Sequence, residues 1–163
     1  MPTTNLHTAL SRLFSELVDG TGTDGGFMLN RGDTGLLRSL DALSAADASR
    51  SANDGATIAA HAEHLRYGLS LMNKWAAKGG NPFADATWDA AWKVSSVDEA
   101  AWKNIRSGLR DEAHAWLQTL NTPREASEAD LCGMIGSIGH LAYHLGAIRQ
   151  IARAARGPRE GTF

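Results

Sequence analysis

The chain has 163 residues and a formal net charge of -2 at pH 7. Folding at this length buries roughly 70% of the surface of the unfolded chain, which is enough for one hydrophobic core without disulfides. The charge balance offers no basic surface for the phosphates of DNA or RNA. Residues 1–163 are therefore predicted to form a single domain that binds no nucleic acid.

Location is predicted from what the chain lacks. Residues 1–5 do not have the basic start and apolar core of a signal peptide, and no apolar run approaches the ~20 residues that a bilayer requires. Cys132 is the only cysteine, which excludes an internal disulfide and fits a reducing compartment. Because Leu131 and Gly133 flank it, we expect a buried, inert thiol. The sequence predicts a cytoplasmic protein without a membrane contact.

The first third of the chain is predicted to hold a long helix, a long loop and a short helix. Apolar residues recur at a three-and-four spacing over about residues 4–18, as in an amphipathic helix. The glycine-rich segment at about 20–34 is predicted to be a loop, which either borders a site or only connects two helices. A short helix at about 36–44 follows, and then a polar linker leads to Gly55.

A second long helix is predicted from Thr57 to about Ala77, because apolar residues there form one stripe. At 100° per residue, His61 and His64 lie beside this stripe, so both side chains can face inward. A second long loop is predicted at about 79–95. Its three aromatic residues are expected to fold onto the core, with a pocket wall or a subunit contact as alternatives; they are Phe83, Trp88 and Trp92.

Two further long helices are predicted from capping signals. Ser96 with Glu99 has the form of a capping box before a helix that continues to Leu120, and Ser127 with Asp130 has the same form before the last helix. His114, in the third helix, has no partner at metal spacing and is expected to be a surface or locally bonded histidine. The fold class predicted is all-α, a four-helix bundle with a short extra helix.

His140 and His144 are the strongest candidates for a metal site. Residues four apart leave one face of a helix one turn apart, so both imidazoles can address one point. Imidazole binds zinc, nickel, copper and iron, and three protein ligands with one open position make a catalytic zinc site. A third ligand would have to come from the cluster at 61–64. The alternative is that these histidines are hydrogen-bonded locally.

Two segments, 55–65 and 133–148, resemble the DinB-like (DinB/YfiT) superfamily of small bacterial metal-binding bundles. Segment 26–37 is similar to a feature of one uncharacterised branch. The resemblance implies a divalent metal, zinc or nickel, held by one histidine of the second long helix and by the two of a His-x-x-x-His-x-Gly pattern. His140, His144 and Gly146 match that pattern. Ala147 departs from it, because a Gln usually follows in the family.

The ligand on the second long helix is assigned from the same resemblance. The family's ligand follows a Ser or Thr at the helix start by seven residues, and counting from Thr57 gives His64. The helical projection places His61 slightly nearer the centre of the apolar stripe. We assign His64 as the ligand and keep His61 as the alternative ligand or as a partner that supports one.

The resemblance also implies candidate functions. Some relatives transfer or use low-molecular-weight thiols, which implies a metal-dependent thiol S-transferase or hydrolase that acts on small electrophiles. The alternative is a non-catalytic metal- or small-molecule-binding bundle, a sensor or scavenger. No catalytic residue is assigned, although Glu63, Tyr67 and Tyr143 are candidate acids or bases. The candidate pocket residues are Tyr67, Trp75, Gly136, Ser137 and Tyr143. A homodimer is expected from the family and from the five tryptophans.

Overall fold

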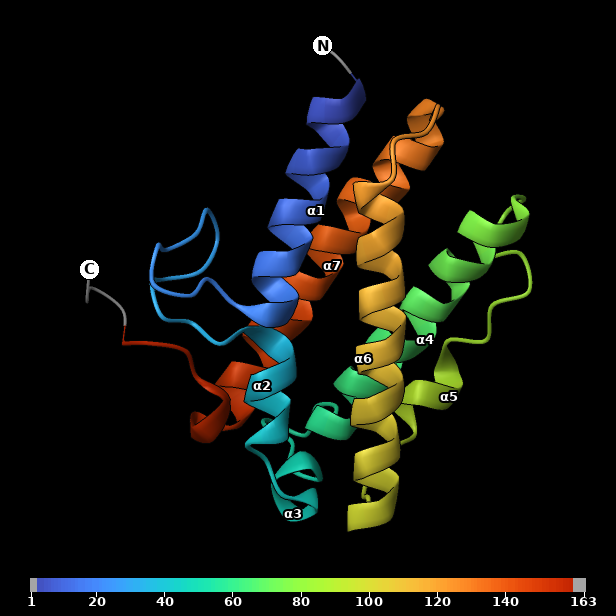
Figure 1. The fold of residues 1–163 in the computed structure, drawn as a ribbon. Coiled ribbons are helices and arrows are strands. Elements are labelled where there is room, and N and C mark those ends of the chain that lie inside the picture. The colour runs from blue at the N-terminus through green and yellow to red at the C-terminus, as the bar shows by residue number, and fades with distance from the viewer. Residues whose placement is uncertain (1–2, 160–163) are drawn as a thin grey trace.

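The structure, a computed structural model, describes residues 3–159, and every regular element in that range is a helix (Figure 1). Four of the helices are long: α1 (Thr3–Asp19), α4 (Ile58–Lys78), α6 (Glu99–Asn121) and α7 (Glu128–Ile151). The others are short: α2 (Gly35–Asp41), α3 (Ala45–Ala48), α5 (Asp89–Trp92) and a 3-10 turn, η1 (Arg153–Ala155). The all-α prediction is confirmed for this part of the chain. The prediction of one short extra helix is wrong, because α3 lies in the linker before Gly55 and α5 lies in the 79–95 loop.

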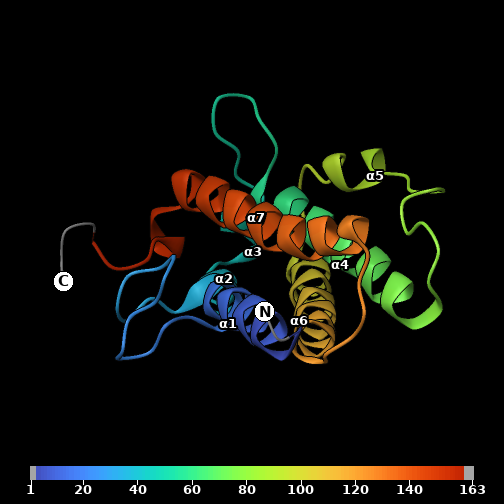
Figure 2. The same ribbon diagram turned by 90° about the horizontal axis from the view of Figure 1, so that it is seen from above.

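The four long helices and α2 surround the core. Both α6 and α7 pack against α1 and α4. Viewed from above, α7 crosses the molecule with α1 and α6 on one side and α5 on the other (Figure 2). The largest side chains without solvent exposure are Trp102 and Trp116 of α6 and Phe14 of α1. Apolar side chains of the four long helices and of α2 supply this core, and burial of apolar surface is the main source of its stability.

The start of α4 is fixed by Thr57, which holds the histidine-bearing helix to the second long loop. The Thr57 hydroxyl oxygen accepts a hydrogen bond from the Ala60 amide at 3.1 Å, as an N-cap does. The same hydroxyl donates to the Val94 carbonyl at 2.6 Å. Since Val94 lies two residues after the end of α5, this bond draws α5 toward the first turns of α4.

One of the two predicted capping boxes is present. At the start of α7 the Ser127 hydroxyl accepts from the Asp130 amide at 3.2 Å, and the Asp130 carboxylate accepts from the Ser127 amide at 2.9 Å. The box predicted at Ser96 is wrong, because Asp98 caps α6 by accepting from the Ala101 amide at 2.7 Å.

The predicted partner of Ser96 has another role. The Glu99 carboxylate accepts a hydrogen bond from the Ala45 amide at 2.9 Å, which satisfies a free amide at the start of α3. The carboxylate is therefore used between two helices and not in a local box. The sequence did not predict this bond between the Glu99 carboxylate and the Ala45 amide, because it did not predict α3.

Cys132 is exposed, so the prediction of a buried thiol is wrong. Cys132 stands two residues before the buried Met134, which places it about 200° around the helix from the side that faces the core. Neighbouring apolar residues do not decide burial on a helix, because the direction of each side chain changes with every residue.

By length and composition, α7 is the one helix among the described residues that could cross a membrane. The core helix of a globular protein passes the same test. Five apolar residues of α7 are buried against the rest of the molecule: Met134, Ile138, Leu141, Leu145 and Ile148. The composition of α7 is therefore weak evidence for a membrane span.

Candidate metal centre

Three histidines from α4 and α7 point their ring nitrogens at one another. The Nε2 atom of His140 lies 3.0 Å from Nε2 of His64 and 3.0 Å from Nε2 of His144. One ligand atom from each of the three rings lies within 4.8 Å of the others, and the group could hold a metal ion. His64 and His144 are buried, and His140 is half-buried.

The spacing of these nitrogens fits a metal better than it fits hydrogen bonds. With metal–nitrogen bonds of about 2.0–2.1 Å, two imidazole ligands lie about 2.8–3.4 Å apart for bond angles between 90° and tetrahedral. Both distances from His140 fall in that interval. An imidazole Nε2 has a single in-plane direction for a hydrogen or a lone pair. His140 therefore cannot make two well-directed hydrogen bonds through one atom, whereas one ion can bind all three nitrogens.

His61 contacts the cluster from behind His144. The two Nδ1 atoms lie 2.8 Å apart, and His61 does not belong to the group of three. If the Nε2 atom of His144 turns its lone pair toward the cluster, its Nδ1 carries the hydrogen and donates it to His61. Such an outer hydrogen bond fixes the tautomer and the ring orientation of a metal ligand. The structure thus places His64 in the three-histidine group and His61 in the supporting position.

The cluster is held in its neutral, metal-binding form. Burial, together with the nearby His140 and His61, lowers the pKa of His64 to about 4 and that of His144 to about 3. Burial also lowers the pKa of His61 and of His140 below the ordinary histidine value. An imidazole binds a metal only when it is unprotonated. At neutral pH the four rings are therefore uncharged, and each can offer one unprotonated nitrogen.

Two tryptophans of the second long loop form one wall of the cluster. The Trp92 ring stacks on His64 with centroids 4.3 Å apart and meets His61 edge-on at 5.5 Å. The centroid of the Trp88 ring lies 5.3 Å from that of His64. The Nδ1 atom of His64 is buried without a hydrogen-bond partner among the residues described. Packing against Trp92, and not an outer hydrogen bond, therefore holds this ring in place.

These tryptophans were not among the predicted site residues. The sequence offered a pocket wall only as an alternative for the aromatic residues of the 79–95 loop, and the structure favours that alternative for Trp88 and Trp92. No sequence signal could have found them, because they reach the histidines through the hydrogen bond by which Thr57 holds the loop to the start of α4. That hydrogen bond spans 37 residues and leaves no pattern in the sequence.

A cavity of about 340 Å³ lies beside the cluster, with His140 in its wall. Gly136 and Ser137 also line it, together with Trp88 and Phe83. A Cβ atom added to Gly136 would meet nothing within 4 Å, so this glycine leaves space open. The cavity is large enough for a small molecule next to the ion site.

The other predicted pocket residues do not line this cavity. Trp75 borders a separate hollow near Pro82. The Tyr67 hydroxyl accepts a hydrogen bond from the Thr87 amide at 3.0 Å, which lowers the pKa of Tyr67. Tyr143 is 70% exposed, although its ring lies edge-on to His144 at 5.0 Å.

Several polar groups near the cluster are already paired. The Ser137 hydroxyl accepts from the Trp116 indole at 2.9 Å and donates to the Met134 carbonyl at 2.7 Å. Glu63 accepts from Arg66 at 2.7 Å. His114 lies on the surface and contacts Asp19 at 3.1 Å, which confirms its predicted role outside the site.

The fold and the site define an all-helical protein with a three-histidine cluster that could hold a metal ion. A scan against protein-family models, a search of curated proteins and a search of solved structures each gave no match. A particular function therefore has to be argued from the site itself.

Proposed function

We propose that the chain binds a divalent metal ion, zinc or nickel, through His64, His140 and His144. The observation that carries this proposal is the pair of 3.0 Å separations from the Nε2 atom of His140 to the other two Nε2 atoms. Both metals accept neutral imidazole ligands.

We also propose that the chain is a DinB-like four-helix bundle. Two observations support this: α6 and α7 each pack against α1 and α4, and the two histidine clusters occur in the same order along the chain as in that superfamily. His140, His144 and Gly146 carry the sequence pattern, and His64 stands seven residues after the helix cap Thr57.

The activity that this site supports best is metal-dependent transfer of a thiol, or hydrolysis, at a small electrophile. A divalent ion with an open coordination position lowers the pKa of a bound thiol or water, so that a nucleophile forms at neutral pH. The cavity beside His140 would bind the electrophile, and Phe83 and Trp88 would exclude water from it. Trp92 and His61 would keep the ligand rings in position.

The second candidate is a non-catalytic metal or small-molecule binder. Two nearby candidate acids or bases already have partners, which favours the non-catalytic binder. Glu63 forms an ion pair with Arg66, and the Tyr67 hydroxyl accepts a hydrogen bond from the Thr87 amide. General acid–base catalysis needs a group within hydrogen-bond reach of the reacting proton. With Glu63 and Tyr67 engaged, an enzyme at this site would depend chiefly on the metal to activate its nucleophile.

One assay separates the two candidates. Protein without a His-tag is incubated with a panel of low-molecular-weight thiols and an aryl halide, before chelation, after chelation and after addition of zinc or nickel. Turnover that disappears on chelation and returns with metal supports the enzyme, and His140→Ala should lack it while His114→Ala retains it. A fully loaded site without turnover for any thiol supports the binder. Failure to take up either metal would refute both.

We further propose a cytoplasmic homodimer. The exposed apolar side chains of Ile135 and Tyr143 on α7 support a subunit contact, and the lone Cys132 is compatible with a reducing compartment. Sedimentation that shows only a monomer at micromolar concentration would contradict the dimer.

A further inference from the structure

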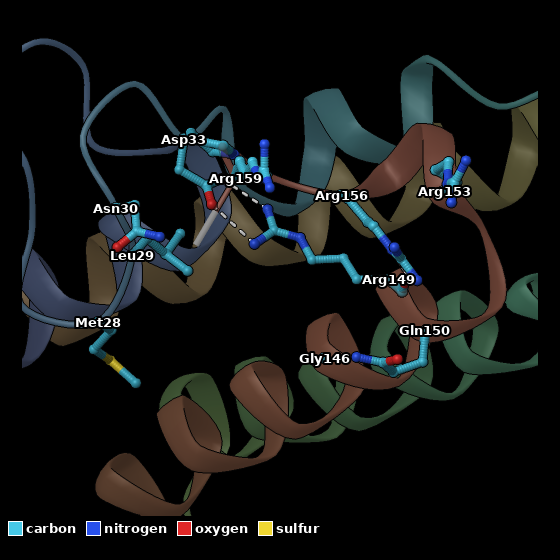
Figure 3. A pocket seen from close by; sticks show the side chains of 12 residues that line it. Met28, Leu29, Asn30, Asp33, Gly146, Arg149, Gln150, Arg153, Arg156 and Arg159 are labelled. Carbon is cyan, nitrogen blue, oxygen red and sulfur yellow. Dashed lines mark hydrogen bonds and ion pairs between the residues drawn. The ribbon is translucent and has the colours of Figure 1, made fainter. Parts of the chain in front are cut away.

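A second cavity, of about 920 Å³, lies on the side of α7 that faces away from the histidines. Gly146 borders it and follows His144 by two residues, so it lies about 200° around the helix from the metal site. The 20–34 loop forms one wall, and the chain after α7 forms the other (Figure 3). This cavity is therefore separate from the candidate metal centre.

Positive charge is concentrated in this cavity. Four arginines line it, Arg149, Arg153, Arg156 and Arg159, and Asp33 is the single acid among the lining residues. The whole chain carries a net charge of -2, so the positive charge is local. Like charges held around one hollow repel one another, and an anion bound among them would remove that cost.

One arginine is held rigidly at the base of the cavity. Arg149 donates two parallel hydrogen bonds to the Asp33 carboxylate, at 2.7 and 2.8 Å, and a third to the Ala155 carbonyl at 3.1 Å. The Asp33 side chain is only 3% exposed. A Cβ atom added to Gly157 would lie 2.3 Å from Asp33 Oδ2, so the chain after α7 passes directly over this ion pair.

The guanidinium groups of Arg153 and Arg156 keep free donors. Arg156 uses only its Nε, which donates to the Arg149 carbonyl at 3.2 Å. The Arg153 guanidinium has no hydrogen bond or ion pair with any residue in the range 3–159. Figure 3 draws Arg149, Arg153 and Arg156 on one side and Met28 and Leu29 of the loop on the other. Free N–H groups in a fork geometry match the oxygens of phosphate and carboxylate.

The loop wall is fixed before any ligand binds. The buried Glu16 carboxylate accepts hydrogen bonds from the amides of Phe27, Met28 and Leu29 at 2.8, 2.6 and 2.5 Å. A Cβ atom on Gly26 would lie 2.2 Å from Glu16 Oε1, so the loop closes tightly on this carboxylate. A preformed wall lowers the entropy that a ligand must lose on binding.

We propose that this cavity binds a small molecule that carries two or more negative charges, a phosphate ester or a polycarboxylate. Its volume is in the range of small-molecule sites. Charge confined to one hollow fits a compact anion better than a long polyanion, which needs a continuous basic surface. The apolar side chains of Met28 and Leu29 would contact the uncharged part of the ligand.

The test is calorimetric titration at constant ionic strength, with pyrophosphate as the phosphate probe and citrate as the carboxylate probe. The variant Arg153→Gln/Arg156→Gln removes two exposed cavity charges and should melt at the temperature of the natural protein. The control Arg50→Gln/Lys103→Gln removes the same charge from two exposed residues that do not line the cavity. We expect saturable binding of at least one probe, weakened at least tenfold in the cavity variant and unchanged in the control.

Three outcomes would overturn the proposal. The first is the absence of saturable binding for both probes at millimolar concentration. The second is equal affinity in the cavity variant and the natural protein, which would place the anion elsewhere, the histidine cluster included. The third is binding of an oligonucleotide or of anionic vesicles through the same arginines without binding of either small anion.

Discussion

Replacement of His61 by alanine should weaken metal binding without abolishing it. The Nδ1 atom of His61 lies 2.8 Å from that of His144, and this contact orients a ligand without touching the ion site. Loss of such an outer partner typically reduces metal affinity about 10- to 100-fold. That range corresponds to about 1.4–2.8 kcal/mol of binding free energy. His61→Asn should recover part of the loss, because an amide oxygen can accept the hydrogen of His144.

The measurement is a competition titration of zinc against a chromophoric chelator, with His64→Ala and His114→Ala alongside. We expect His64→Ala to lose tight binding and His114→Ala to match the natural protein, since His114 contacts only Asp19 at the surface. If His61→Ala abolished binding while His64→Ala reduced it only tenfold, the assignment of ligand and partner would be reversed.

Three further predictions concern stability. In the folded, metal-free protein the pKa of His64 is about 4 and that of His144 is about 3, whereas the value in the unfolded chain is 6.5. As the pH falls below 6.5, the unfolded chain therefore binds more protons than the folded protein does. The free energy of unfolding should therefore drop by up to about 1.4 kcal/mol per pH unit for each histidine; urea titrations that show no change between pH 6.5 and 5 would contradict this. Asp33→Ala leaves the half-buried Arg149 unpaired and should cost about 3 kcal/mol by the same assay, whereas Asp89→Ala, which breaks an exposed pair with Lys93, should cost nothing measurable. Asp98→Ala should cost about 1 kcal/mol through loss of the helix cap, and Ser96→Ala should cost none; equal losses would show that the cap is misassigned.

Elements with a strong local signal could be predicted from the sequence. The apolar stripe and Thr57 define α4, and Ser127 with Asp130 defines the start of α7. The spacing of His140 and His144 put both on one face of α7. Family resemblance, and not geometry, selected His64 over His61, and the structure places His64 in the group of three.

Features that depend on contacts between distant segments could not be predicted. Trp92 reaches His64 because the Thr57 hydroxyl binds the Val94 carbonyl, a pairing that the sequence does not mark. The ion pair between Asp33 and Arg149 joins residues 116 positions apart, so the arginine cavity was not predicted. Asp33 stood in a glycine-rich loop whose role the sequence left open.

The most direct test of the metal centre is elemental analysis of protein purified without a His-tag and dialysed with zinc or nickel. The three-histidine site predicts about one metal ion per chain. His114→Ala should keep full occupancy, because His114 lies at the surface. His144→Ala should hold little metal, because His144 supplies an Nε2 ligand. The absence of metal after dialysis, or equal occupancy in the two variants, would contradict the assignment.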